Sequence, residues 1–452
     1  MSSHWRTCPL RGLAMAMVAF VLFGCVSHPV TSPLLEGPKN GFPIVQGLTS
    51  KTATQISIVA PSTLPLQFRY RDGDKTTILI SEVHHPKKPA TGVAVVTHHL
   101  LIEHLKSGVN YTLEVVNANG EILDQRIFQT LDLSAKSAKI ATASCMSDVF
   151  LTEARSMWKA LIEAKPDLVM LIGDNVYAEG DSRFKGPLAE EALWIRYNET
   201  FQTLDFYRTH DLIPTIVTWD DHDYGMHDGD GTNPYKADSK LTLEAFYAQT
   251  PSKAFPEFVT GPGVSSRLDA FGHRFLLLDD RSFRGDTHFG PEQEEWLLKE
   301  ARASRSPVWL ISGDQWFGAY HRFESYERGQ PQSFKGFLKA LRSVREPVIF
   351  MSGDRHLNEI MRIEKDILGY ETYEFTSSAL HSRMYPGGWD KDPNPRQVHG
   401  IDLQPNFDLF ELTTPRPHQP VQIKGFVIGM DSKVLYSFNF KVARTASTKP
   451  RQ

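Results

Sequence analysis

Three carboxylates and an imidazole follow directly on an apolar run that extends from Ile213 to Trp219. The run has the length and the β-branched composition of a buried strand. Adjacent carboxylates are not tolerated inside a core strand unless water, a counter-charge or a cation compensates them. We therefore expect these residues at the carboxyl end of the strand, where α/β sheets place their ligand sites. They are Asp220, Asp221, His222 and Asp223.

Five other apolar runs also end in residues that can bind a cation or transfer a proton. The ends carry Ser144 and Cys145; Asp174 and Tyr177; Asp279, Asp280 and Arg281; Asp314; and Asp354 with His356. Six such ends indicate one shared edge, lined mainly by oxygen ligands with a few nitrogen and sulfur ligands. This combination of donors suits metal ions.

Three motifs are specific when they occur together. They are Gly-Asp-x-x-Tyr at 173–177, Trp-Asp-Asp-His-Asp at 219–223 and Gly-Asp-Arg-His at 353–356. With Ser144-Cys145, Asp280-Arg281 and the segment 374–378, the set resembles the PhoD-like alkaline phosphatase/phosphodiesterase family of the metallophosphatase superfamily. The resemblance covers the chain from about residue 42 to the C-terminal strands. It implies phosphoester hydrolysis on iron(III) with calcium; zinc, manganese and magnesium are the alternative ions.

The resemblance also implies roles for individual residues. Cys145 and Tyr177 would bind iron, Asp174 would bridge two metals, and Asp221 would hold the second metal. Asp354 and His356 would complete the cluster from the last of the six strand ends.

Two residues are candidates for contact with the substrate. His222 is expected to donate a proton to the leaving oxygen or a hydrogen bond to the phosphate. Arg281 can place two donors on phosphate oxygens, and the alternative is an ion pair with Asp279 or Asp280.

Further carboxylates are expected to orient these groups from behind. They are Asp220, Asp223, Asp228 and Asp314. The sequence departs from the family at one point, because no Asn follows the Asp-Asp-His motif until Asn233. His227 or Asp228 is the candidate to replace that Asn.

The elements that must position these residues alternate between strands and helices over 138–443, which is typical of an α/β fold. Helices are predicted at 154–164, 190–204, 291–303 and 333–344, and closing strands at 407–413, 421–429 and 434–442. The resemblance specifies this α/β part as the metallophosphatase-like four-layer α/β sandwich.

Residues 42–132 are rich in short β-patterned runs separated by turn residues, and they predict a β-sandwich. The runs lie at 55–59, 66–70, 77–83, 92–97, 111–116 and 122–128. Leu105–Tyr111 is similar to the tyrosine-corner segment of fibronectin type III domains. We therefore expect a fibronectin type III-like domain ahead of the catalytic one.

The N-terminus carries Arg6 and Arg11 before an apolar run that ends in Gly24-Cys25. This pattern predicts a signal peptide over 1–25. It resembles a bacterial lipoprotein signal, with Cys25 as the lipidated residue, followed by a tether at 26–41. A polar tail occupies 444–452. The expected location is the cell envelope, lipid-anchored on the periplasmic or outer-membrane side.

The cysteine count supports a role for Cys145. The chain has three cysteines, and Cys8 and Cys25 belong to the predicted signal. Cys145 therefore has no disulfide partner in an oxidising compartment, which favours a metal-bound thiolate over an inert buried thiol.

The composition excludes few classes of protein. The formal net charge is −4, from 49 basic and 53 acidic residues over 452 positions. No basic stripe interleaved with aromatic residues indicates nucleic-acid binding. No obligate protein partner is indicated either.

The leading hypothesis is an exported, membrane-anchored phosphoesterase that hydrolyses phosphate esters by attack of a metal-bound hydroxide. A second hypothesis keeps the fold but gives it phosphodiesterase or phospholipase activity on lipid or wall polymers. A third is a surface-anchored binding protein with an inactive phosphatase fold. The near-complete set of costly carboxylates favours an enzyme.

Overall fold

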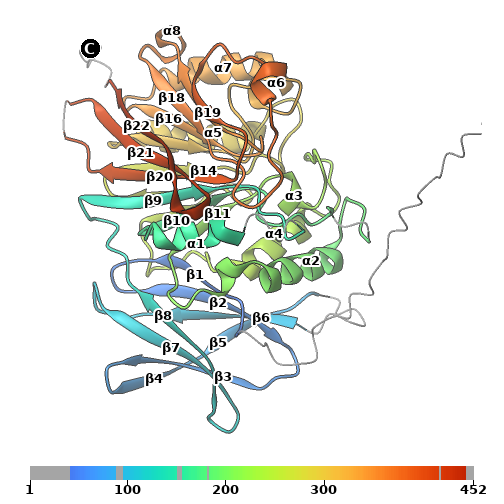
Figure 1. Cartoon of the computed structure of the whole chain (residues 1–452), viewed down its shortest axis with the longest axis vertical. Helices are drawn as coiled ribbons and strands as arrows, with labels where there is room; N and C mark the ends of the chain where they lie inside the picture. The colour runs from blue at the N-terminus through green and yellow to red at the C-terminus, as the bar shows by residue number, and fades with distance from the viewer. Residues whose placement is uncertain (1–40, 88–94, 150–154, 181–182, 417–418, 444–452) are drawn as a thin grey trace, which may run out of the picture. The chain divides into compact units, whose positions relative to one another are not determined.

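The computed structural model describes residues 41–87, 95–149, 155–180, 183–416 and 419–443. The predicted signal peptide with Cys25, the tether up to residue 40 and the tail from residue 444 lie outside these residues. The described residues belong to one compact unit, in which a β-sandwich precedes a mixed α/β part, and this confirms the predicted fold class (Figure 1). The exact domain bounds 42–132 and 138–443 stay predictions.

Eight strands form the β-sandwich, because short apolar-alternating runs can bury one face each. They are β1 (Ile44–Thr49), β2 (Thr54–Pro61), β3 (Leu66–Asp72), β4 (Lys75–Leu79), β5 (Ser81–His84), β6 (Val95–Ile102), β7 (Asn110–Asn117) and β8 (Ile122–Gln129). Two antiparallel sheets result, in the orders β1-β2-β6-β5 and β4-β3-β7-β8. The hydroxyl of Tyr111 accepts a hydrogen bond from the Lys106 amide at 2.6 Å, which confirms the tyrosine-corner prediction.

The single strand expected at 77–83 is wrong. The chain leaves one sheet after β4 and enters the other at β5, and the intervening Ile80 is 92% exposed. A period-2 pattern does not reveal such a change of sheet, because both strands keep an alternating sequence.

A six-stranded sheet in the order β11-β10-β9-β20-β21-β22 begins the α/β part. Its strands are β9 (Ser137–Ala143), β10 (Leu168–Ile172), β11 (Thr215–Thr218), β20 (Asn406–Thr413), β21 (Val421–Gly429) and β22 (Val434–Val442). The first three are parallel to one another and the last three close the sheet antiparallel.

An eight-stranded sheet has the order β12-β13-β14-β15-β16-β18-β17-β19. Its strands are β12 (Phe258–Thr260), β13 (Ser266–Ala270), β14 (His273–Leu277), β15 (Val308–Ile311), β16 (Val348–Ser352), β17 (Asn358–Ile363), β18 (Thr372–Thr376) and β19 (Gln397–Ile401). The neighbours β14, β15, β16 and β18 are parallel.

The four predicted helices are confirmed within a few residues, as α1 (Arg155–Glu163), α2 (Glu190–Thr203), α5 (Gly290–Ala303) and α7 (Pro331–Leu341). The sequence reading missed α4 (Lys236–Phe246). The shorter helices are α3 (Asp221–Tyr224), α6 (Tyr326–Gly329), α8 (Lys365–Leu368), α9 (Gly388–Lys391), η1 (Asp205–Arg208) and η2 (Met430–Ser432). Within the described part of the chain, none of the helices has the length and apolar character needed to cross a membrane.

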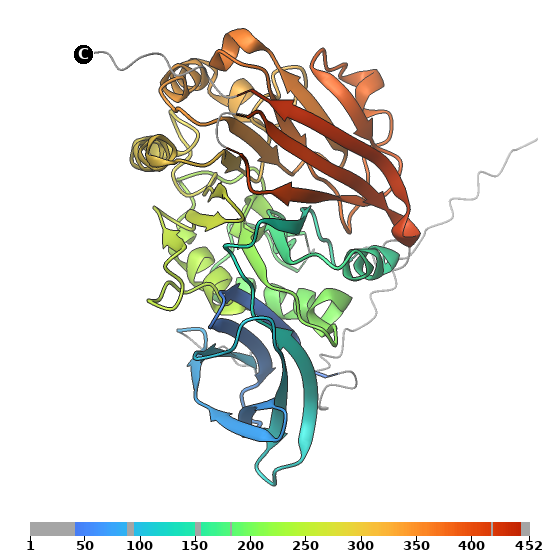
Figure 2. The same ribbon diagram turned by 90° about the vertical axis from the view of Figure 1, so that its left-hand side faces the viewer.

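The two α/β sheets stack face to face, as Figure 2 shows. Buried aromatic and aliphatic side chains form the core between them. Trp309 on β15 and Phe375 on β18 meet Phe410 on β20, with ring centroids 5.4 and 5.2 Å apart. On the opposite face of the eight-stranded sheet, Phe350 contacts Trp316, whose ring stacks on Phe337 of α7. Alternating strand residues therefore bury one face against a sheet and the other against helices.

Each of the six predicted strand ends lies at the carboxyl end of its strand, but they belong to two sheets and not to one. Cys145, Asp174 and Asp220 follow β9, β10 and β11; Asp280, Asp314 and Asp354 follow β14, β15 and β16. The expectation that all six ends share the edge of one sheet is therefore wrong. The two sheets stack, and the carboxyl ends of their parallel strands meet at the site.

Glycine at position 313 allows this approach. A Cβ atom on Gly313 would lie 2.6 Å from both the Cγ of Asp220 and the Oδ2 of Asp280. Gly173, at φ +121°, faces Asp220 and Gly313 in the same way. The Gly-Asp pairs thus place carboxylates where two backbones come too close for a side chain.

Candidate active site

Four donors of different chemistry converge where β9, β10 and β16 end. The Sγ of Cys145 lies 3.5 Å from Oδ2 of Asp174, and the Tyr177 hydroxyl lies 3.3 Å from the same oxygen. Nε2 of His356 lies 2.7 Å from the Tyr177 hydroxyl. We call Cys145, Asp174, Tyr177 and His356 the mixed-donor cluster. The structure therefore brings together four of the six residues expected to bind metal.

The backbone holds several of these side chains in an unusual conformation. Cys145, Asp174, Asp354 and His356 have positive φ angles of 59°, 53°, 63° and 50°. Non-glycine residues adopt this left-handed region rarely and at a cost of about 1–3 kcal/mol each. Such strain concentrates at functional sites, where the surrounding fold imposes the geometry.

A second group consists of carboxylates alone. Oxygens of Asp174, Asp220 and Asp354 lie within 4.8 Å of one another. Burial raises the pKa of Asp174 well above its ordinary value, and although His222 opposes this, the carboxylates of Asp221, Asp223 and Asp354 raise it further. Mutual repulsion in a buried site is relieved by a bound cation.

Two features of the site indicate that its donors suit a metal ion. Oδ2 of Asp220 and Oδ1 of Asp221 are buried and have no hydrogen-bond partner among the described residues. Burial, with Asp174 beside it, also raises the pKa of the Cys145 thiol well above its ordinary range. Buried oxygens without partners and a thiol surrounded by carboxylates are costly unless a cation binds them.

Two residues contact Asp221 in the segment where the sequence departs from the family motif. Nδ1 of His227 lies 3.1 Å from Oδ2 of Asp221, and the Asp228 amide donates to the same oxygen at 2.7 Å. Asp221, Asp228 and Glu324 also bring carboxylate oxygens within 4.8 Å. Both candidates named from the sequence therefore contact Asp221, the residue expected to hold the second metal.

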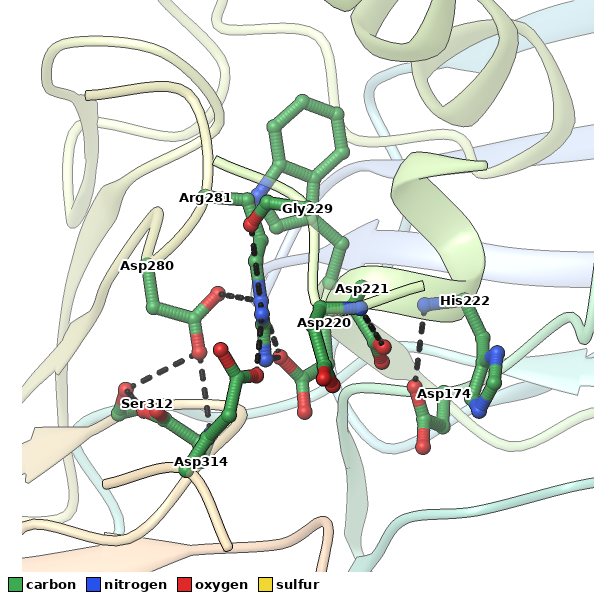
Figure 3. Close-up of polar contacts among 12 residues, drawn as sticks. Asp174, Asp220, Asp221, His222, Gly229, Asp280, Arg281, Ser312 and Asp314 are labelled. Carbon is green, nitrogen blue, oxygen red and sulfur yellow. Dashed lines mark hydrogen bonds and ion pairs between the residues drawn. The ribbon is translucent and has the colours of Figure 1, made fainter. Parts of the chain in front are cut away.

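Arg281 is fully buried and surrounded by carboxylates (Figure 3). Its Nε donates to Oδ1 of Asp220 at 2.6 Å, and its Nη1 donates to Oε2 of Glu324 at 2.7 Å. Oδ1 of Asp280 lies 3.6 Å from Nε. Burial opposes the charge, but these carboxylates raise the pKa of Arg281 well above its ordinary value. Its expected contact with substrate stays a prediction, and the geometry favours a role in orienting Asp220.

Asp223 and Asp314 act on their neighbours from behind the cluster. Asp223 accepts from the amides of Val176 at 2.9 Å and Asp220 at 3.1 Å, so it fixes the turn after β10 and the end of β11. Asp314 accepts from Arg284 and His288, each at 2.9 Å. Both positions agree with the supporting role that the sequence suggested.

His222 is oriented by Glu179, which the sequence reading missed. Nδ1 of His222 contacts Oε1 of Glu179, and the imidazole stacks on the Tyr177 ring at 4.1 Å. Burial opposes protonation, but Asp221, Asp174 and Glu179 raise the pKa of His222 well above its ordinary value. The imidazole therefore favours the protonated form that a proton donor requires.

Glu324, which contacts Arg281, was also missed. It lies in the long connection between β15 and α6, where no periodic pattern singles it out. Glu179 gave one weak signal, because it follows the Gly-Asp-x-x-Tyr motif by two residues.

Residues 140–412 match the family model described as PhoD-like phosphatase. A solved structure described as that of PhoD aligns with a TM-score of 0.65 and 16% identity, over 91% of this chain and 94% of that one. At this identity the alignment shows the fold alone. The comparison with curated proteins gives no match.

Proposed function

Because the chain belongs to the PhoD-like phosphatase family, it is a hydrolase of phosphate esters, and we propose that it is one that works with bound metal ions. The observation that carries this proposal is the pair of buried carboxylate oxygens without partners, on Asp220 and Asp221, beside the mixed-donor cluster. A bound cation would compensate the mutual repulsion of these buried carboxylates.

We assign the ions by donor chemistry. Iron(III) suits the mixed-donor cluster, because a thiolate and a phenolate are strong anionic ligands. Calcium suits the all-carboxylate group of Asp174, Asp220 and Asp354. When bound, such cations neutralise the charge on phosphoryl oxygens and activate water for attack.

The residues of the chain itself prepare the substrate. Glu179 holds the His222 ring in one orientation, so that its other nitrogen is available to protonate the leaving oxygen. Arg281 holds Asp220 from behind. Membership of the family indicates hydrolysis of phosphate esters. Rates on monoesters, diesters and lipid or wall polymers would show which of these substrates the protein prefers.

The test of metal dependence uses protein purified without chelators. We expect near-stoichiometric iron together with calcium by elemental analysis, and a visible absorption band from a tyrosinate–iron bond. Tyr177→Phe should remove the band, while Phe283→Tyr, as a control for an aromatic change outside the mixed-donor cluster, should leave it in place. Asp174→Ala should abolish hydrolysis of an aryl phosphate. Full turnover by Asp174→Ala, or by chelator-treated protein free of metal, would contradict the proposal.

Export and anchoring are proposed from the sequence of residues 1–25, which resembles a lipoprotein signal. The full-length chain should then take up labelled fatty acid and remain with the membrane fraction. Cys25→Ser should abolish the labelling and release the protein. Equal labelling of both forms would overturn this assignment.

A further inference from the structure

A pocket of about 280 Å³ lies beside the mixed-donor cluster. Tyr177 and His356, two members of the cluster, form part of its wall. An organic group attached to a phosphate at the cluster can therefore extend into this space. The charged residues that line the pocket decide which groups it accepts, and they are Asp148, Arg196 and Arg383.

Two of these charges compensate each other. Nη2 of Arg196 donates to both carboxylate oxygens of Asp148, at 2.7 and 2.9 Å, and both residues are buried. Nη1 of Arg196 pairs in addition with Glu199. These groups form the wall of the pocket and add little net charge to it.

Arg383 is different, because its side chain is exposed and its guanidinium makes no hydrogen bond or ion pair with any residue in the described part of the chain. It is therefore the uncompensated charge among the described residues that line the pocket. A cation in this position favours an anionic group on the ligand.

The backbone fixes Arg383 at the pocket. On one side, the His381 amide donates to the Cys145 carbonyl at 3.1 Å, and the His381 carbonyl accepts from Ser147 at 2.7 Å. On the other side, the Tyr385 amide donates to the His356 carbonyl at 2.9 Å. The segment is thus tied to the ends of β9 and β16, so little backbone entropy is lost when Arg383 binds a ligand.

We propose that Arg383 binds a second anionic group of the substrate, carried on the organic arm of the ester and seated in this pocket. The inference rests on the proposed function and names the substrate class, phosphate esters that bear a further carboxylate or phosphate. The planar guanidinium suits both groups, because each can accept two parallel hydrogen bonds.

The test compares two aryl phosphates of nearly equal size, 3-carboxyphenyl phosphate and its neutral analogue 3-carbamoylphenyl phosphate, on the full-length metal-loaded protein. Arg383→Gln should lower kcat/KM for the carboxylate ester about 3- to 10-fold, mainly through KM, and change that for the neutral ester by less than about 2-fold. Arg383→Lys should retain part of the preference. The difference between the esters should shrink as the salt concentration rises.

Arg305→Gln is the matched control. Arg305 is also exposed, but it precedes β15, at the edge of the sheet opposite to the site. It should leave both esters unchanged. Equal losses on the two esters in Arg383→Gln, or no loss at all, would overturn the inference. Wild-type protein that hydrolyses neither ester would overturn the proposed function, and the inference with it.

Discussion

The guanidinium of Arg281 lies against the carboxylate of Asp220, with Nε 2.6 Å from Oδ1, and both side chains are fully buried. The other oxygen of Asp220 has no hydrogen-bond partner among the described residues. Asp220 belongs to the all-carboxylate group that it forms with Asp174 and Asp354. Arg281 thus supports Asp220 on one side while the site side remains available for a cation.

Removal of one partner from this pair should destabilise the fold strongly. Arg281→Met leaves the buried carboxylate of Asp220 without its guanidinium partner, and the expected loss is about 3–5 kcal/mol. Thermal and denaturant unfolding of the metal-loaded protein measures it. Arg305→Met, at an exposed position, should change stability by less than about 0.5 kcal/mol. Similar unfolding curves for both variants would contradict a structural role for the buried pair.

Gly313 should be intolerant of a single methyl group. In Gly313→Ala the new Cβ would overlap Asp220 and Asp280, so one of the two sheet edges must move and activity should fall. Gly336→Ala is the matched control, because Gly336 lies inside α7 with open space around its Cβ position. This variant should gain about 0.5–1 kcal/mol. Activity and unfolding of both variants would be measured together, and unchanged activity in Gly313→Ala would show that the contact is not required.

Loss of the proposed proton donor should depend on the leaving group. His222→Ala should slow phenyl phosphate, which has a basic leaving oxygen, by about 100- to 10,000-fold. It should slow 4-nitrophenyl phosphate much less, since that leaving group departs without a proton. Glu179→Ala should show the same order of sensitivity with a smaller loss, about 10- to 100-fold. The slope of log kcat against leaving-group pKa is the measurement, and an unchanged slope would assign His222 to phosphate binding instead.

The free energy of unfolding should decrease as the pH is lowered, in part because of His99, which lies in the β-sandwich. Nε2 of His99 contacts the Ala245 carbonyl at 2.7 Å, where β6 packs near α4. Burial lowers the pKa of His99 from 6.5 to about 4. The unfolded chain therefore binds this proton at higher pH than the folded chain, so stability is lost as the pH falls from about 6.5 to about 4.

His99→Gln keeps a donor for the Ala245 carbonyl but does not titrate. Its unfolding free energy should depend less steeply on pH in that window than the wild-type value, although the half-buried His84 and His98, whose pKa values are also lowered by burial, contribute in the same direction. Parallel pH profiles for the two proteins would contradict the assignment to His99.

The sequence by itself determined which residues could do the chemistry and where each stands on its own strand. A run such as Ile213–Trp219 followed by Asp220 is a local signal, because a buried strand must end where carboxylates begin. The same reasoning located Cys145, Asp174 and Asp354.

Only the tertiary structure decided how these ends meet. The partners Arg281 and Asp220 are 61 residues apart and come from different sheets, and no periodicity links them. Glu179 and Glu324 lie in loops, so they join the site only through the fold. Local patterns fix the direction and the end of a strand, whereas the stacking of two sheets depends on the complementary packing of residues such as Trp309 and Phe410, which are distant in sequence.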